Sequence, residues 1–216
     1  MTPREPRDPP PRGSPPPPRP PEPPVPLADP DAVARTLLAA GRTRAAAEEV
    51  IRLHGPRVRQ YLRSVLREPD AAEDAYSLWS EWMVRALGRF RGDSSLLTWS
   101  FGVARNAVRR IRDDAFRRRR CSLRRGAISR LPAPRVTSSL RRAERASAFL
   151  EAIRLDLSPE DREILALRVD QGLAWEEVAT ILAGGGSTVT AAALRKRFER
   201  MRDRIQRLAA EKGELQ

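Results

Sequence analysis

Apolar side chains recur every three or four positions over most of the chain beyond residue 30, and this spacing predicts α-helices. The clearest stripe runs through residues 72–90 and is rich in aromatic side chains. A second stripe follows in residues 96–112, with Trp99 and Phe101 among its members. The polar stretch 91–95 lies between the two stripes and contains a glycine. We therefore predict two consecutive helices joined by a short loop.

The sequence before this pair also predicts helices. Helical spacing of apolar residues begins near residue 31, and Gly41 is expected to divide a short first helix from a longer second one. Pro56 lies inside the longer helix and is a candidate for a kink. Asp70 is the expected N-cap of the helix over residues 72–90, with Glu73 at the spacing of a capping box.

The C-terminal third has the layout of a helix-turn-helix. Ser158 is an expected N-cap with Pro159 at the first helical position, and that helix is expected to end at Gly172. A short helix from about residue 174, a turn with three glycines at 184–186 and a basic helix over about residues 190–210 follow. In such a unit the last helix enters a DNA major groove. The pattern as a whole predicts an all-α protein.

Composition divides the chain into five segments. Residues 1–30 hold 15 of the 20 prolines and are expected to form a disordered tail. Two small helical domains are predicted over residues 31–113 and 146–210, and residues 211–216 form a short tail. The polybasic linker between them, residues 114–145, holds 11 cationic and 2 anionic side chains. It is either a solvated, self-repelling spacer or a segment that runs along phosphates, and its arginine density favours phosphate contact.

The charge balance points to nucleic acid as a partner. The formal net charge is +13, and because Lys196 and Lys212 are the only lysines, 39 of the 41 cationic side chains are arginine. The planar fork of arginine matches phosphate groups and guanine edges. The surplus is uneven, since residues 146–182 hold 3 cationic and 8 anionic side chains.

Residue counts argue against several functional classes. Cys121 and His54 are the only cysteine and histidine, which excludes disulfide frameworks and the usual zinc sites. The acidic residues, such as Glu73 and Asp93, fall on helix caps and faces, so no catalytic residues, metal or cofactor are predicted. No stretch reaches the roughly 18 apolar residues of a membrane span, so we expect no membrane insertion and a cytoplasmic location.

One face of the helix over residues 96–112 is strongly polar and basic. It carries Arg105, Asn106, Arg109, Arg110 and Arg112. This face is either an ordinary solvated face of a helical bundle or a platform that presents guanidinium groups to phosphates and an amide to bases. The helix alone leaves both interpretations open.

The order of the motifs resembles the extracytoplasmic-function group of bacterial sigma factors, within the sigma-70 family. AED at 72–74, RALGRFRGDSSL at 85–96, TW at 98–99 and ARN at 104–106 are similar to region 2 of that family. LSPEDREIL at 157–165, GLAWEEVA at 172–179 and LRKRF at 194–198 are similar to region 4. The resemblance covers about residues 50–208. It implies a factor that binds core RNA polymerase and directs promoter recognition, DNA melting and transcription initiation, with no chemistry of its own.

The resemblance also implies where the polymerase would bind. The helix from Asp74 to Leu87 would dock on the clamp of the largest subunit through Asp74, Leu78, Glu81 and Arg85, and the flap would be a second contact on the core. It leaves open an anti-sigma factor as a further partner.

Two groups of residues would contact promoter DNA if the resemblance holds. The loop and the helix after it would hold an unstacked base and the melted strand, with the residues Arg91, Asp93, Ser94, Ser95, Trp99, Arg105, Asn106, Arg109 and Arg110. The last helix would read the more distant promoter element through Thr190, Arg195, Lys196, Arg197 and Arg200. The turn before this helix is longer than the family's usual turn.

A conventional helix-turn-helix regulator is the alternative. It would use residues 31–113 to sense a signal or to dimerise, and it would bind a palindromic site without polymerase.

Overall fold

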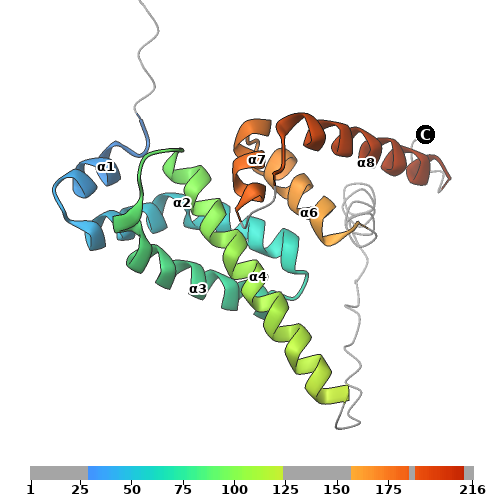
Figure 1. Cartoon of the computed structure of the whole chain (residues 1–216), viewed down its shortest axis with the longest axis horizontal. Helices are drawn as coiled ribbons and strands as arrows, with labels where there is room; N and C mark the ends of the chain where they lie inside the picture. Colours follow the sequence, from blue (N-terminus) through green and yellow to red (C-terminus); the bar gives the residue numbers. More distant parts are fainter. Residues whose placement is uncertain (1–28, 124–156, 185–187, 212–216) are drawn as a thin grey trace, which may run out of the picture.

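A computed structural model describes residues 29–123, 157–184 and 188–211, and every regular element in these ranges is helical (Figure 1). The all-α prediction is confirmed for this part of the chain. The prolines of the predicted tail up to residue 26 and most of the predicted linker lie outside the described residues.

The helices before residue 124 form one unit, which we call the N-terminal domain. It contains α1 (Ala32–Ala39), α2 (Thr43–Leu66), α3 (Pro69–Ala86), the 3-10 turn η1 (Leu87–Arg89) and α4 (Leu96–Leu123). Gly41 separates α1 from α2 with a φ of 71°, a left-handed conformation that glycine adopts without strain, as the sequence predicted. Figure 1 shows α4 crossing this domain, with its C-terminal half extending beyond the other helices.

The helices after residue 156 form the C-terminal domain. They are α6 (Pro159–Leu165), the π-helical turn η2 (Ala166–Asp170), α7 (Trp175–Ala183) and α8 (Ala191–Glu211). The predicted N-cap is confirmed, because Ser158 Oγ accepts the backbone N–H of Asp161 at 3.1 Å. Gly172 has a φ of 69°, which reverses the chain before α7. The ring of Trp175 packs edge-on against that of Phe198 with 5.4 Å between centroids, and this contact joins α7 to α8.

Aromatic residues fill the core of the N-terminal domain. Trp79, Tyr61 and Phe101 are fully buried, on α3, α2 and α4 respectively. The indole N–H of Trp79 donates to the carbonyl oxygen of Ser100 at 3.1 Å, which satisfies its one polar atom. Trp79 therefore joins α3 to α4 inside the domain, and its side chain does not reach the surface.

Two local predictions differ from the structure. The N-cap of α3 is Glu68 and not Asp70, since Pro69 occupies the first helical position and holds the residue before it in an extended conformation. Proline has no N–H to donate, so the first turn is the place where a helix tolerates it. The helix predicted to end near residue 112 continues as α4 to Leu123, so the boundary at 113 does not end a helix. Pro56 lies inside α2, which is assigned as one helix throughout.

The two domains contact each other. Helix α2 packs against α6 and η2, and α4 packs against α7. Most buried apolar side chains of the two domains belong to one continuous cluster. Two of the predicted DNA-binding residues, Arg105 and Arg109, lie on the side of α4 that faces the C-terminal domain.

Candidate nucleic-acid interface

The side chains of α4 divide into two neighbouring stripes. The first, which we call the covered face, faces the C-terminal domain and consists of Thr98, Arg105, Arg109 and Arg112. Thr98 is buried, Arg105 and Arg112 are half-buried, and Arg109 stays exposed. Arg105 Nε donates to Glu163 Oε2 at 3.0 Å, and Arg112 donates to Glu163 Oε1 at 2.6 Å. Arg105 and Arg109 also donate to the carbonyl oxygen of Gly184, at 3.1 and 2.8 Å. Two of the predicted DNA contacts, Arg105 and Arg109, are thus engaged within the chain.

The second stripe, which we call the open face, consists of Trp99, Asn106 and Arg110. Asn106 is exposed and Trp99 is half-buried, with its ring edge-on to Phe90 at 5.7 Å between centroids. Arg110 lies 3.1 Å from Asp114 one turn further along, a pair at the surface that contributes little to stability. An aromatic ring next to an amide and a guanidinium can stack on a base and bind the neighbouring phosphate.

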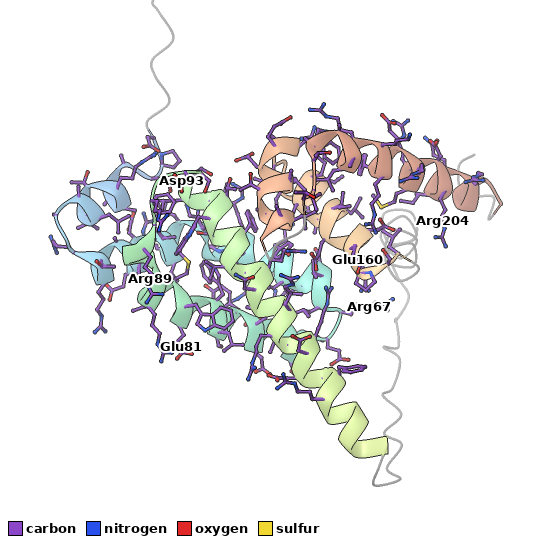
Figure 2. The ribbon with its side chains drawn as sticks, viewed as in Figure 1. Arg67, Glu81, Arg89, Asp93, Glu160 and Arg204 are labelled. Carbon is purple, nitrogen blue, oxygen red and sulfur yellow. The ribbon has the colours of Figure 1, made fainter. Side chains whose placement is uncertain are left out.

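The loop before α4 lies at the end of this open face. Gly92 has a φ of 82°, which lets the loop turn sharply. Ser95 caps α4: its Oγ accepts the backbone N–H of Thr98 at 3.0 Å and lies 2.8 Å from the Thr98 hydroxyl. Arg91 and Asp93 are exposed, and Figure 2 shows Asp93 beside the first turn of α4. The Ser94 hydroxyl donates to the carbonyl of Ser95 at 3.3 Å.

The outer side of α3 carries the residues that the resemblance assigns to polymerase contact. Asp74, Glu81 and Arg85 are exposed and Leu78 is half-buried, all on one stripe (Figure 2 labels Glu81). Glu81 and Arg85 form an ion pair of 2.6 Å. Val84 is 41% exposed beside them. A valine exposed among charged side chains is compatible with a protein partner, although one such residue is common on any surface.

The start of α8 carries the remaining predicted contacts. Thr190 Oγ1 accepts the backbone N–H of Ala193 at 3.2 Å, so Thr190 caps the helix. Arg195 pairs with Glu176 of α7 at 2.8 Å. Arg197 donates to Asp161 at 2.6 Å and to Ser158 Oγ at 3.3 Å, which fastens α8 to the first turn of α6. Lys196 and Arg200 are exposed.

Several residues of this interface were not identified from the sequence. Glu163, which accepts from two arginines, is only 5% exposed at its side chain. The acidic bias of residues 146–182 was the available signal, but it does not say which carboxylate meets which arginine. Beneath them the Tyr61 hydroxyl is fully buried, and burial, followed by the nearby charge of Glu163, raises the pKa of this phenol.

The part of the chain that the structure describes contains neither a candidate metal site nor a candidate membrane span. No group of three or more histidine, cysteine, aspartate or glutamate side chains is arranged there to hold a metal ion. In the same residues, no helix is both long and apolar enough to cross a lipid bilayer.

Comparison with known proteins supports the resemblance to the sigma-70 family. Residues 50–120 match the family model for sigma-70 region 2, a span that includes most of α2, all of α3 and the arginine-bearing part of α4. The resemblance to the sigma-70 family, within which the motifs point to the extracytoplasmic-function group, is confirmed.

One curated protein and one solved structure are similar to the chain beyond region 2. The RNA polymerase sigma factor CarQ of Myxococcus xanthus is 29% identical over 172 residues, which cover 76% of this chain and 91% of CarQ. A solved structure of CnrH, in complex with the cytosolic domain of CnrY, is 20% identical, with a TM-score of 0.59 over 85% of this chain and 99% of that chain. The second likeness shows the fold.

Proposed function

We propose that this sigma factor binds core RNA polymerase and directs it to promoters. The N-terminal domain opens promoter DNA and holds the separated strand, and the C-terminal domain binds the upstream duplex. The observation that carries the proposal is that one chain combines a region 2 match over residues 50–120 with a helix-turn-helix whose last helix has exposed cationic side chains.

The open face of α4 and the loop before it are suited to a melted strand. Opening a duplex requires a place for an extruded base and cations for the separated backbone. Trp99 and Asn106 offer stacking and hydrogen bonds, and the loop over residues 91–95, with Arg91, Asp93 and Ser94, lies next to them. Ser95 acts here by capping α4 and so fixes the loop relative to the helix.

The C-terminal domain is suited to a duplex. Helix α8 begins at a capped, small-residue turn, so its backbone can approach a groove closely. Lys196 and Arg200 are the side chains best placed for phosphate, because both are exposed. Arg195 and Arg197 can bind DNA only if they exchange or share their carboxylate partners.

The polymerase contact is assigned to the stripe Asp74, Leu78, Glu81 and Arg85 on α3, with the clamp as its partner and the flap as a second contact for the C-terminal domain. A regulatory partner is also proposed. The solved complex of CnrH with the cytosolic domain of CnrY supports a search for an anti-sigma factor that binds this chain.

A matched pair of variants tests the polymerase contact. The chain is mixed with its cognate core polymerase and passed over a sizing column. Glu81→Lys should abolish co-elution, because it reverses a charge in the proposed contact. Glu48→Lys is the control, since Glu48 also pairs with an arginine four residues away on an exposed helix but lies on α2. Run-off transcription from a genomic library with core enzyme and this protein then identifies the promoters.

The two candidate functions give opposite results in this experiment. Failure of the wild-type chain to co-elute with core would overturn the proposal and favour a helix-turn-helix regulator that acts without polymerase. Equal loss with both variants would show that the outer side of α3 is not the contact.

A further inference from the structure

The outer side of α8 is open to solvent. Helix α8 packs on α6 and α7, and Figure 1 shows it extending beyond both of them. Leu194 and Met201 lie seven positions, or about two turns, apart and are 4% and 5% exposed, so they mark the inner side of the helix. The opposite side carries the exposed residues Ala192, Ala193, Lys196, Glu199, Arg200 and Asp203.

Glu199 differs from two other acidic residues of the helix-turn-helix. Glu176 pairs with Arg195 at 2.8 Å, and Asp203 lies 3.9 Å from Arg202. The Glu199 carboxylate is exposed and forms no ion pair or hydrogen bond within the described part of the chain. It is therefore available to a partner from outside the chain.

The surroundings of Glu199 are cationic. Residues 191–211 hold 7 cationic and 3 anionic side chains. On the surface of the helix, Arg195 lies on one side of Glu199, and Lys196 and Arg200 lie on the other. The phosphates of a duplex line the two edges of a groove, whereas the edges of the bases form its floor. The flanking cations thus match phosphates, and the carboxylate between them faces the bases, because a phosphate would repel it.

A carboxylate distinguishes the four bases in the major groove. Cytosine presents its N4 amino group as a donor, whereas guanine presents two acceptors, which repel a carboxylate. Adenine has the acceptor N7 beside its amino group, and thymine presents an acceptor and a methyl group. The best partner for Glu199 is therefore cytosine. Ala192, about two turns nearer the start of α8 on the same line, is small and allows the helix to lie deep in the groove.

We propose that Glu199 is a specificity-determining residue, which accepts a hydrogen bond from the N4 amino group of one cytosine in the promoter duplex. This inference rests on the proposed function and adds a base preference to it. Glu199 also weakens binding to other sequences, because its charge is left unpaired opposite the other three bases. Lys196 and Arg200 supply the attraction to phosphate that does not depend on sequence.

Selection from random duplexes tests the base preference. The full-length chain is assembled with core polymerase, and the probe is a duplex library with a randomised stretch of about ten base pairs, one turn of DNA. The wild-type holoenzyme should retain sequences that share a cytosine at one position. Replacing this cytosine by thymine, with adenine opposite, should weaken binding about fivefold or more, which is the lower end for one specific base contact.

Two variants of Glu199 have different expected results. Glu199→Ala removes the acceptor, so no base should be preferred at this position. Glu199→Gln offers an amide, which bonds adenine at N6 and N7, so the preferred base should change from cytosine to adenine. A residue that only stabilised the fold would not cause this change.

Asp203→Asn is the matched control. It also removes a negative charge from the outer side of α8, one turn beyond Glu199, and it should keep the cytosine preference. Both carboxylates are exposed, so the melting temperatures of all three variants should match that of the wild-type chain.

The outcomes separate the two proposals. A cytosine preference that persists in Glu199→Ala, or that Asp203→Asn removes equally, would overturn the role of Glu199 and leave the proposed function intact. A wild-type holoenzyme that retains no sequence above the random pool would overturn both. Loss of the preference in Glu199→Ala and its change to adenine in Glu199→Gln, with Asp203→Asn like wild type, support the inference.

Discussion

At the scale of single residues, similar side chains have very different roles in this protein. Trp79 is buried and fastens α3 to α4, whereas Trp99 lies half-exposed next to the loop. The spacing on the helix separates them, since Trp79 lies on the inward stripe. His54, the only histidine, is buried against Asp31, with 2.8 Å between Nε2 and Oδ1. The Asp31 carboxylate is turned toward this ring and does not cap α1.

Asp31→Ala should destabilise the fold, because it leaves the buried imidazole without its acceptor. The loss expected for an unsatisfied buried donor is about 1–3 kcal/mol. Urea unfolding followed by circular dichroism measures it. Asp31→Asn is the matched control, since the amide oxygen can still accept, and it should lose less. Equal losses would mean that the negative charge, and not the hydrogen bond, provides the stabilisation.

The residue scale also separates what could be predicted from what could not. The N-cap Ser158 was predictable, since a cap depends on neighbours within three positions. The position of Pro69 decided the start of α3 over the better cap residue Asp70, and that conflict is also local. The pair of His54 and Asp31 joins residues 23 positions apart. No local pattern encodes a contact that depends on how α1 folds back on α2.

At the scale of elements, α8 is held by its neighbours as much as by its own sequence. Its first turn is capped by Thr190, and Arg197 fastens it to Asp161 in α6. The family resemblance placed Arg195, Lys196, Arg197 and Arg200 of α8 against promoter DNA and made no distinction between them. The structure distinguishes Arg197, which has carboxylate and hydroxyl partners, from Lys196, which is exposed.

Two alanine variants of α8 should therefore behave differently. Lys196→Ala should weaken binding to promoter duplex, reduce the salt slope by about one and leave the melting temperature unchanged. Arg197→Ala should also lower the stability, by roughly 0.5–1 kcal/mol, because it removes the link to α6. Salt titrations of duplex binding and thermal unfolding measure both effects. An unchanged melting temperature in Arg197→Ala would contradict the positioning role.

At the scale of the whole molecule, the two domains act as one body in this arrangement. One apolar cluster continues from the N-terminal domain into the C-terminal domain, and Arg105 and Arg112 of the first domain bind the Glu163 carboxylate of the second. The sequence predicted two helical domains and a basic surplus, and the match to sigma-70 region 2 agrees with the region 2 motifs. The sequence placed Arg105 and Arg109 among the DNA contacts of α4, but it did not predict that both would face the C-terminal domain.

Cutting the chain between the domains tests whether they hold each other. A protease site introduced within residues 124–156 would separate the chain into two fragments, and we expect them to co-elute from a sizing column at low salt. About 1 M salt should weaken the association, because the Debye length falls to about 3 Å. The cut Glu163→Gln chain is the control and should separate more readily. Fragments of the wild-type chain that elute apart at low salt would show that the contact needs the covalent link.

The sequence by itself determined the helices, most of their ends and the resemblance to the sigma-70 family, because helical periodicity, caps and motifs depend on residues close together in the chain. It also determined that α4 and α8 would be basic. Only the tertiary structure decided which arginines of α4 meet the other domain. Glu163 of α6 and the Gly184 carbonyl at the end of α7 lie against one stripe of α4 and leave the other open. That choice depends on the meeting of residues more than 50 positions apart, which a linear pattern does not specify.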